Sequence, residues 1–173
     1  MRSKGSGNAG LTNFVRNYGG AKAVAVVLID ASKAVLACLA GMLIFRGTGY
    51  EKEGMMLGAV AVSLGHDFPA LLGFRGGKGI LSGFAIAMTL DYRCGLIILG
   101  IFAVTFLITR YVSLSSVLGA VGFCISFVVF YHDRIWVMLG GVFIGLLAVF
   151  MHRSNIRRLL KGTESRMTFG KKE

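Results

Sequence analysis

The chain has 173 residues, of which 55% are hydrophobic and only 16% charged, and its mean hydropathy is +0.72. Soluble domains carry about 25% charged residues, so this composition argues against an ordinary soluble fold and indicates an integral membrane protein. The net charge of +11 would suggest a nucleic-acid partner in a soluble protein, but the aromatic residues do not alternate with the basic ones as a stacking surface requires. We therefore expect a lipid bilayer as partner and no nucleic acid.

Apolar stretches separated by charged residues or glycine follow one another along the chain. A helix needs about 20 apolar residues to cross a bilayer. Pro69, the only proline, is expected to end or bend the second stretch. The composition predicts an all-α, polytopic helix bundle in a single domain (1–173), in which polar segments 1–22 and 152–173 flank the spans of 23–151. We expect about six spans, at 23–45, 54–72, 80–90, 94–109, 112–131 and 135–151.

The stretch 80–90 is short, and it either crosses the bilayer or dips in and returns. If it crosses, fourteen of the 19 Lys and Arg residues lie on one side, four lie on the other, and Lys33 lies within a span. A re-entrant stretch would divide the charges almost equally. Because basic residues concentrate in cytoplasmic loops, the first arrangement is favoured. Both termini are then cytoplasmic, together with four polar segments at 5–20, 65–79, 110–116 and 152–165.

The first polar segment, GSGNAGLTNFVRNYGG, is rich in glycine, serine and asparagine. Glycines permit close backbone approach, and successive N–H groups then form an anion-binding nest. Arg16 could add a two-pronged contact to a phosphate or carboxylate. The alternative is a flexible leader before the first span.

The second polar segment, GHDFPALLGFRGGKG, places Gly76, Gly77 and Gly79 around Lys78 directly before a helix. A helix N-terminus after a glycine turn suits a phosphate group. The segment is not a Walker A loop, because that motif needs an earlier glycine and a Ser or Thr after the lysine. A plain interhelical turn remains the alternative.

The same segment contains adjacent His66 and Asp67. Their spacing is not the H-x-x-x-x-D spacing of a common class of acyltransferases. A structural, hydrogen-bonding histidine is the alternative to a catalytic one.

The remaining polar residues are divided between two cytoplasmic segments and one span. Ser113 could line a polar vestibule or simply pack a helix. His152 and Asn155, three residues apart, share one helical face, whereas the surrounding arginines suit an amphipathic tail on anionic lipid. Asp30 and Lys33 are charged at membrane depth, where such residues are paired or functional, and an ion pair would satisfy both.

Three of these segments, in this order and at these separations, resemble the three motifs of the acyl-phosphate:glycerol-3-phosphate acyltransferase family, often called PlsY. The segments are GSGNAGLTN with Arg16, GHDFPALLGFRGGKG and HRSNIRRLLKGTE, with DASK and RYVSLSS between them. The resemblance implies transfer of a fatty acyl group from acyl phosphate to the 1-hydroxyl of sn-glycerol 3-phosphate. The products are lysophosphatidic acid and phosphate, in bacterial phospholipid synthesis. It also implies no metal or organic cofactor, a monomer, and the bacterial inner membrane.

Site roles follow from the same resemblance. Ser6, Arg16, His152 and Asn155 match residues critical for catalysis, and Gly76, Gly77, Lys78, Gly79 and Ser113 match substrate-binding positions. Asp30, Lys33 and Glu164 are expected to be structural.

The sequence departs from the family pattern at its start. Ala9 and Leu11 replace residues of the usual first motif, but neither change removes a reacting group. Family members carry seven spans, and the helix before the first motif has no counterpart here, so we expect the reading frame to begin upstream.

A membrane transporter of organic phosphates is the alternative function. Transporters usually place their polar groups near the bilayer midplane. Here only Asp30 and Lys33 lie within a span, so the enzyme is favoured.

Overall fold

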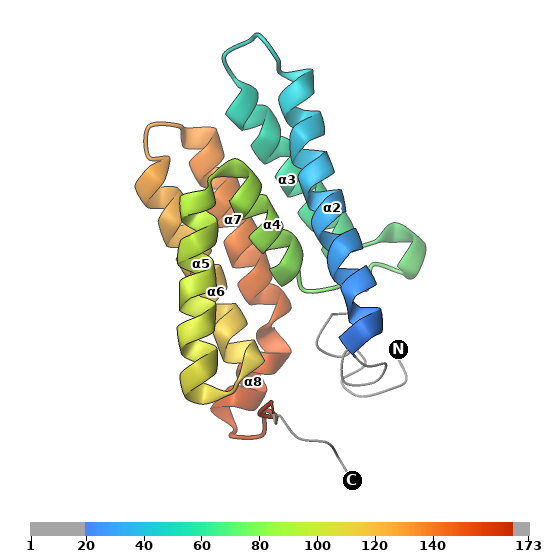
Figure 1. Cartoon of the computed structure of the whole chain (residues 1–173), viewed down its shortest axis with the longest axis vertical. Coiled ribbons are helices and arrows are strands. Elements are labelled where there is room, and N and C mark those ends of the chain that lie inside the picture. The colour runs from blue at the N-terminus through green and yellow to red at the C-terminus, as the bar shows by residue number, and fades with distance from the viewer. Residues whose placement is uncertain (1–19, 168–173) are drawn as a thin grey trace.

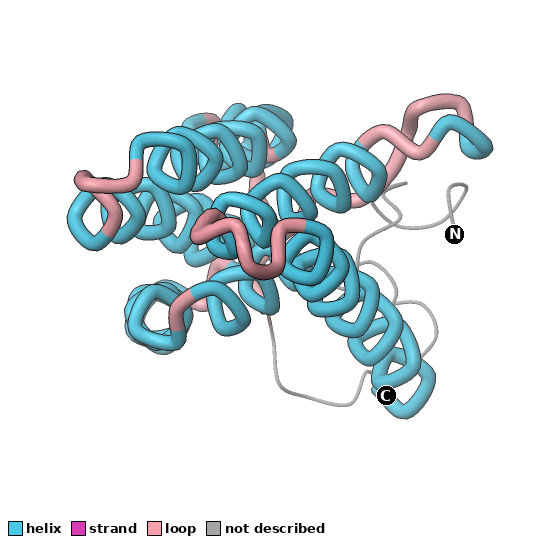
Figure 2. The backbone as a smooth tube through the Cα atoms, turned by 90° about the horizontal axis from the view of Figure 1, so that it is seen from above, coloured by secondary structure: helices cyan, strands magenta, loops and turns pink. Residues whose placement is uncertain are grey.

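The computed structural model describes residues 20–167, and over this range Figure 2 shows only helices and loops. The elements are α2 (Gly20–Ile44), α3 (Glu51–Asp67), the 3₁₀ turn η1 (Ala70–Leu72), α4 (Ile80–Leu90), α5 (Tyr92–Thr109), α6 (Val112–Phe130), α7 (Ile135–Met151) and α8 (Arg153–Leu160).

The helical membrane bundle expected from the sequence is confirmed. Four segments of the described chain are long and apolar enough to cross a bilayer, namely Val24–Ile44, Glu51–Leu72, Tyr92–Thr109 and Val112–Phe130. A fifth is added if α7 and α8, which meet at a bend of 55°, count as one span. The described chain therefore has four to five candidate spans, where the sequence predicted about six. The difference is α4, whose 11 residues extend about 16 Å, roughly half the hydrocarbon thickness.

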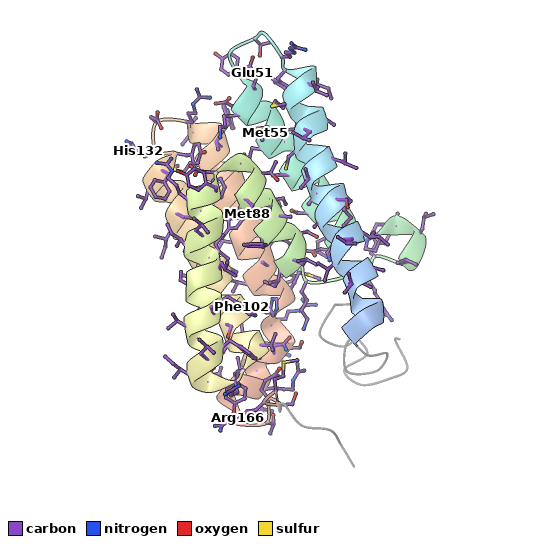
Figure 3. All side chains as sticks on the ribbon, in the orientation of Figure 1. Glu51, Met55, Met88, Phe102, His132 and Arg166 are labelled. Carbon is purple, nitrogen blue, oxygen red and sulfur yellow. The ribbon has the colours of Figure 1, made fainter. Side chains whose placement is uncertain are left out.

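The connections between helices gather at two opposite ends of the bundle (Figure 1). The α2–α3 and α6–α7 connections share one end, and Figure 3 labels Glu51 and His132 there. The α5–α6 connection and α8 lie at the other end, where Figure 3 labels Arg166. The loop 73–79 enters α4 part-way along the bundle, at the end of α4 that faces this second end (Figure 1), and Lys78 of this loop contacts Asn155 of α8. Three of the four predicted polar segments therefore share one end, and the fourth, 5–20, lies outside the described residues.

Proline and glycine determine where α3 ends and the next elements begin. Helix α3 ends at Asp67, two residues before Pro69, which is the N-cap residue of η1. Pro69 lacks an N–H and disfavours helical geometry in the residue before it. Gly73 and Gly79 then adopt φ values of +64° and +69°, which an L side chain rarely adopts. The expectation that Pro69 ends the second stretch is confirmed.

Small residues bring α2 and α3 close together. A Cβ added to Gly58 would collide with the backbone of Ala37, and Gly41 and Gly54 meet in the same way. Such close approach is typical of helix pairs in membranes, where small residues permit tight packing. At the end away from the predicted site, Lys52 donates hydrogen bonds to the Leu90 carbonyl and the Tyr131 hydroxyl, and so ties α3 to α4 and α6.

Candidate active site

The glycine loop packs tightly against the end of α3. The Gly76 N–H donates to the Asp67 carbonyl at 3.0 Å, and the Gly77 N–H donates to the His66 carbonyl at 3.1 Å. A Cβ on Gly77 would overlap the His66 ring. These glycines are needed for close approach, and their two N–H groups already have acceptors. The predicted role of Gly76 and Gly77 in substrate binding remains a prediction.

The helix that follows the loop still offers donors. Gly79 is the N-cap residue of α4, and the first N–H groups of a helix have no carbonyl partner within it. These groups, with the positive end of the helix dipole, remain available to an anion or a hydroxyl.

Lys78 begins a chain of polar contacts that leads to α8 and the C-terminal segment. Its ammonium group donates to Asn155 Oδ1 at 2.5 Å, and Asn155 Nδ2 donates to Glu164 Oε1 at 3.0 Å. Arg158 Nε donates to Glu164 Oε2 at 2.6 Å. The structure thus joins the second and third motifs, 77 residues apart in the chain, in one network.

Burial and neighbouring charges modify the ionisation of this network. Burial, together with the positive charge of Arg158, lowers the pKa of Lys78 to about 8. Burial alone would raise the pKa of Glu164, but hydrogen bonds from Arg158 and Asn155 outweigh it and hold that pKa below its usual value. Lys78 therefore carries a positive charge that is poorly solvated and that a phosphate would stabilise.

His152 lies at the bend between α7 and α8. It is only 4% exposed, and its Nδ1 lies 2.8 Å from the Ala148 carbonyl. A carbonyl only accepts, so Nδ1 carries the proton and Nε2 of the neutral ring keeps its lone pair. That tautomer leaves Nε2 as a possible proton acceptor. Asn155, one turn onward, is 6% exposed, so these two of the four residues predicted to be catalytic are both buried.

Ser113 is placed at the beginning of α6. It is buried, and its hydroxyl lies near the Glu164 carboxyl, whose pKa it helps to lower. Its predicted role in substrate binding remains a prediction.

The expected ion pair between Asp30 and Lys33 is present, with 2.6 Å between Lys33 Nζ and Asp30 Oδ1. The structure adds His66, whose Nδ1 lies 2.5 Å from Lys33 Nζ. An ammonium only donates, so His66 Nδ1 is the acceptor. His66 thus links α2 to the end of α3, beside the glycine loop.

An apolar pocket adjoins the glycine loop between α3, α4, α5, α6 and α7. Gly79 lies at one side of it, and Ala148, whose carbonyl holds His152, lies at another. Phe102, labelled in Figure 3, lines it from α5. Its remaining lining residues are mostly apolar, including Phe84, Ile98, Phe123, Ile144 and Leu147.

Asp67 also lines this pocket, and sequence reasoning did not single it out as a site residue. The available signal was its i, i+4 relation to Ser63, which places both on one face of α3. Arg158 was likewise treated only as one of the arginines of an amphipathic tail. Ser6 and Arg16, both predicted to be catalytic, lie outside the described residues.

Comparison with known proteins gives the class of protein. Residues 1–162 match the family model described as glycerol-3-phosphate acyltransferase. The glycerol-3-phosphate acyltransferase of Thermoanaerobacter sp. (strain X514) is 40% identical over 167 residues, which cover 96% of this chain and 81% of that protein. The corresponding protein of Chlorobium luteolum is 34% identical over 202 residues, covering 99% and 86%.

Two solved structures are also similar. Both are of PlsY (YgiH), described as an integral membrane glycerol 3-phosphate acyltransferase. The glycerol 3-phosphate form has a TM-score of 0.83 at 30% identity and covers 96% of this chain and 82% of that one. The lysophosphatidic acid form has a TM-score of 0.82 at 32% identity and covers 94% and 81%.

The chain therefore belongs to the glycerol-3-phosphate acyltransferase family. It is a multi-pass integral membrane enzyme that acylates glycerol 3-phosphate to lysophosphatidic acid. Family membership favours the enzyme over the transporter alternative.

Proposed function

We propose that the acyl donor is acyl phosphate and that the acyl group passes directly to the 1-hydroxyl of sn-glycerol 3-phosphate. The observation that carries this proposal is the position of Lys78, a half-buried cation next to Gly79, which lines the apolar pocket. A phosphorylated polar substrate and a lipid tail need these two environments side by side. Acyl phosphate is already activated because phosphate is a good leaving group.

Lys78 binds the phosphate of glycerol 3-phosphate in this proposal. Asn155 and Glu164 hold the lysine, and Arg158 adds a second positive charge to the network. Hydrogen bonds to charged groups contribute about 1.5–3 kcal/mol, and a preformed cation avoids the entropy cost of ordering a flexible side chain.

The acyl chain occupies the apolar pocket, with its carbonyl toward Gly79. The hydroxyl oxygen forms a bond to the carbonyl carbon, the bond from that carbon to the phosphate oxygen breaks, and phosphate leaves. Free N–H groups at the beginning of α4 suit the charge that develops on the carbonyl oxygen, and one such donor is typically worth about 10²–10³ in kcat. The hydroxyl proton passes to a protein base or to a phosphate oxygen, and His152 Nε2 is one candidate.

Ser6 and Arg16 complete the proposed site as catalytic residues. The site faces the cytoplasm of a bacterial inner membrane, with both termini on that side. The positive-inside distribution of the basic residues supports this orientation. The enzyme acts as a monomer without a metal or organic cofactor.

The test of the phosphate-binding role is Lys78→Ala. The KM for glycerol 3-phosphate should rise by about 10–100-fold, which corresponds to one lost charge-assisted hydrogen bond, while the KM for acyl phosphate changes little. Lys161→Ala removes a positive charge from an exposed position of the same end and should leave both values unchanged. Equal increases in the two KM values for Lys78→Ala would contradict the assignment.

A further inference from the structure

A glycine interrupts the wall of the apolar pocket on α4. Gly83 is buried, and it lines the pocket together with Ile80 and Phe84 of the same helix. A Cβ built on Gly83 would meet no described atom within 4 Å. The position therefore has room for a side chain that the sequence does not supply.

The other two glycines that line the pocket from within helices have close neighbours. A Cβ on Gly145 of α7 would collide with Cys124 Sγ of α6, so this glycine is needed for the contact between the two helices. A Cβ on Gly119 of α6 would lie 3.5 Å from Ile98 Cγ2, which is an ordinary van der Waals contact. Packing therefore accounts for the space at these two positions, but not for the space at Gly83.

Stability alone would favour a larger residue than glycine at position 83. Glycine in the interior of a helix is less stable than alanine. Apolar space left unfilled in a protein interior costs further stability, because the surrounding atoms lose packing contacts. Alanine would improve both terms and would fit without a collision. Space kept open at such a cost indicates that a ligand fills it.

The directions of the helices place this space deeper in the pocket than Gly79. Helices α4 and α6 run away from the end of the bundle that holds α8, whereas α5 and α7 run toward it (Figure 1). Gly83 follows Gly79 by four residues, which is about 6 Å along α4. By the same reasoning, the inner end of the pocket is closed by three buried side chains from α5, α6 and α7, namely Ile98, Phe123 and Ile144. Gly83 leaves open space on the α4 side of this pocket.

We propose that Gly83 determines the length of the acyl chain that the enzyme accepts; this inference rests on the proposed function, in which the acyl carbonyl lies toward Gly79. A chain that starts there reaches Gly83 after about 6 Å. A butyryl group ends before this position, whereas a palmitoyl group has to pass it. The open space beside Gly83 gives the methylene groups of the long chain room. A side chain at this position would fill that space and exclude long chains, while short chains would still bind.

The experiment compares Gly83→Ala and Gly83→Leu in the full chain, purified in detergent, with palmitoyl phosphate and butyryl phosphate as donors. One methylene group in an apolar pocket changes kcat/KM by about 10–200-fold. With palmitoyl phosphate, kcat/KM should therefore fall about tenfold in the alanine variant and at least about 100-fold in the leucine variant. Neither variant should change kcat/KM for butyryl phosphate or the KM for glycerol 3-phosphate. Gly100→Leu, at an exposed position of α5 with open space around its Cα, is the matched control and should behave as wild type with both donors.

The melting temperature separates this role from a packing role. Alanine is a better helix former than glycine, so Gly83→Ala should melt at the wild-type temperature or above it, and this variant carries the test if the leucine variant does not fold. A lower melting temperature for Gly83→Ala would show that packing needs the glycine, and would overturn the proposal. So would an equal loss of kcat/KM with the two donors, or a higher KM for glycerol 3-phosphate. A wild-type chain that acylates glycerol 3-phosphate from neither donor would contradict the proposed function itself, whereas unchanged donor selectivity in both variants would contradict this inference alone.

Discussion

At the scale of single residues, the ionisation of Lys78 makes the binding of glycerol 3-phosphate depend on pH. Its pKa of about 8, against an ordinary 10.5, means that its charge is lost as the pH rises through 8. The charged form is the one that binds phosphate. We therefore predict that the KM for glycerol 3-phosphate is constant below pH 7 and rises above pH 8. Initial rates over a pH series, at saturating acyl phosphate, measure this.

Lys78→Arg is the control for that pH dependence. A guanidinium group stays protonated throughout the range, so the rise above pH 8 should disappear even if the KM is higher at every pH. An unchanged rise in this variant would assign the titration to another group.

Asn155 bridges two charged groups, so its loss should affect both. Asn155→Leu removes the acceptor of Lys78 and one donor to Glu164. A buried group left without a partner costs about 1–3 kcal/mol; the half-buried Lys78 loses its Asn155 acceptor, whereas Glu164 keeps its contact with Arg158. We expect a lower melting temperature and a higher KM for glycerol 3-phosphate. Ser154→Ala, at the exposed neighbouring position, should change neither quantity.

At the scale of elements, the close contact between the glycine loop and α3 places Lys78. Gly77→Ala adds a methyl group where the His66 ring lies, so the loop must shift and carry Lys78 with it. We predict at least a tenfold loss of kcat/KM for glycerol 3-phosphate, since small displacements of a binding group are costly. Gly65→Ala, in α3 with open space around its Cα, is the matched control. Equal activity in the two variants would contradict this role of the loop.

The elements also show which features a sequence reveals. Local relations were predictable: Asp30 and Lys33 are three residues apart on one helix, and Pro69 stops a helix through its own geometry. The direction of the Gly76 and Gly77 N–H groups was not, because it depends on how the loop meets α3. The Lys78–Asn155 contact joins residues 77 positions apart, and only the motif resemblance suggested that they belong to one site.

At the scale of the whole molecule, the two ends of the bundle should face different compartments. The α2–α3 connection and the C-terminal segment lie at opposite ends (Figure 1). We predict that Thr48→Cys reacts with a membrane-impermeant thiol reagent added outside intact cells, whereas Ser165→Cys reacts only after permeabilisation. The native Cys38 and Cys94 are buried; the wild-type chain gives the background. The reverse labelling pattern would place the site outside the cytoplasm.

In the proposed function, this bundle couples phosphate release to acylation of glycerol 3-phosphate, with acyl phosphate as donor. The most direct measurement uses purified protein, palmitoyl phosphate and radiolabelled glycerol 3-phosphate, with phosphate and labelled lipid followed together. We predict that phosphate and 1-acylglycerol 3-phosphate form in equal amounts, and that neither forms when palmitoyl-CoA replaces the acyl phosphate. Phosphate release that continues without glycerol 3-phosphate, or equal lipid formation from palmitoyl-CoA, would contradict it.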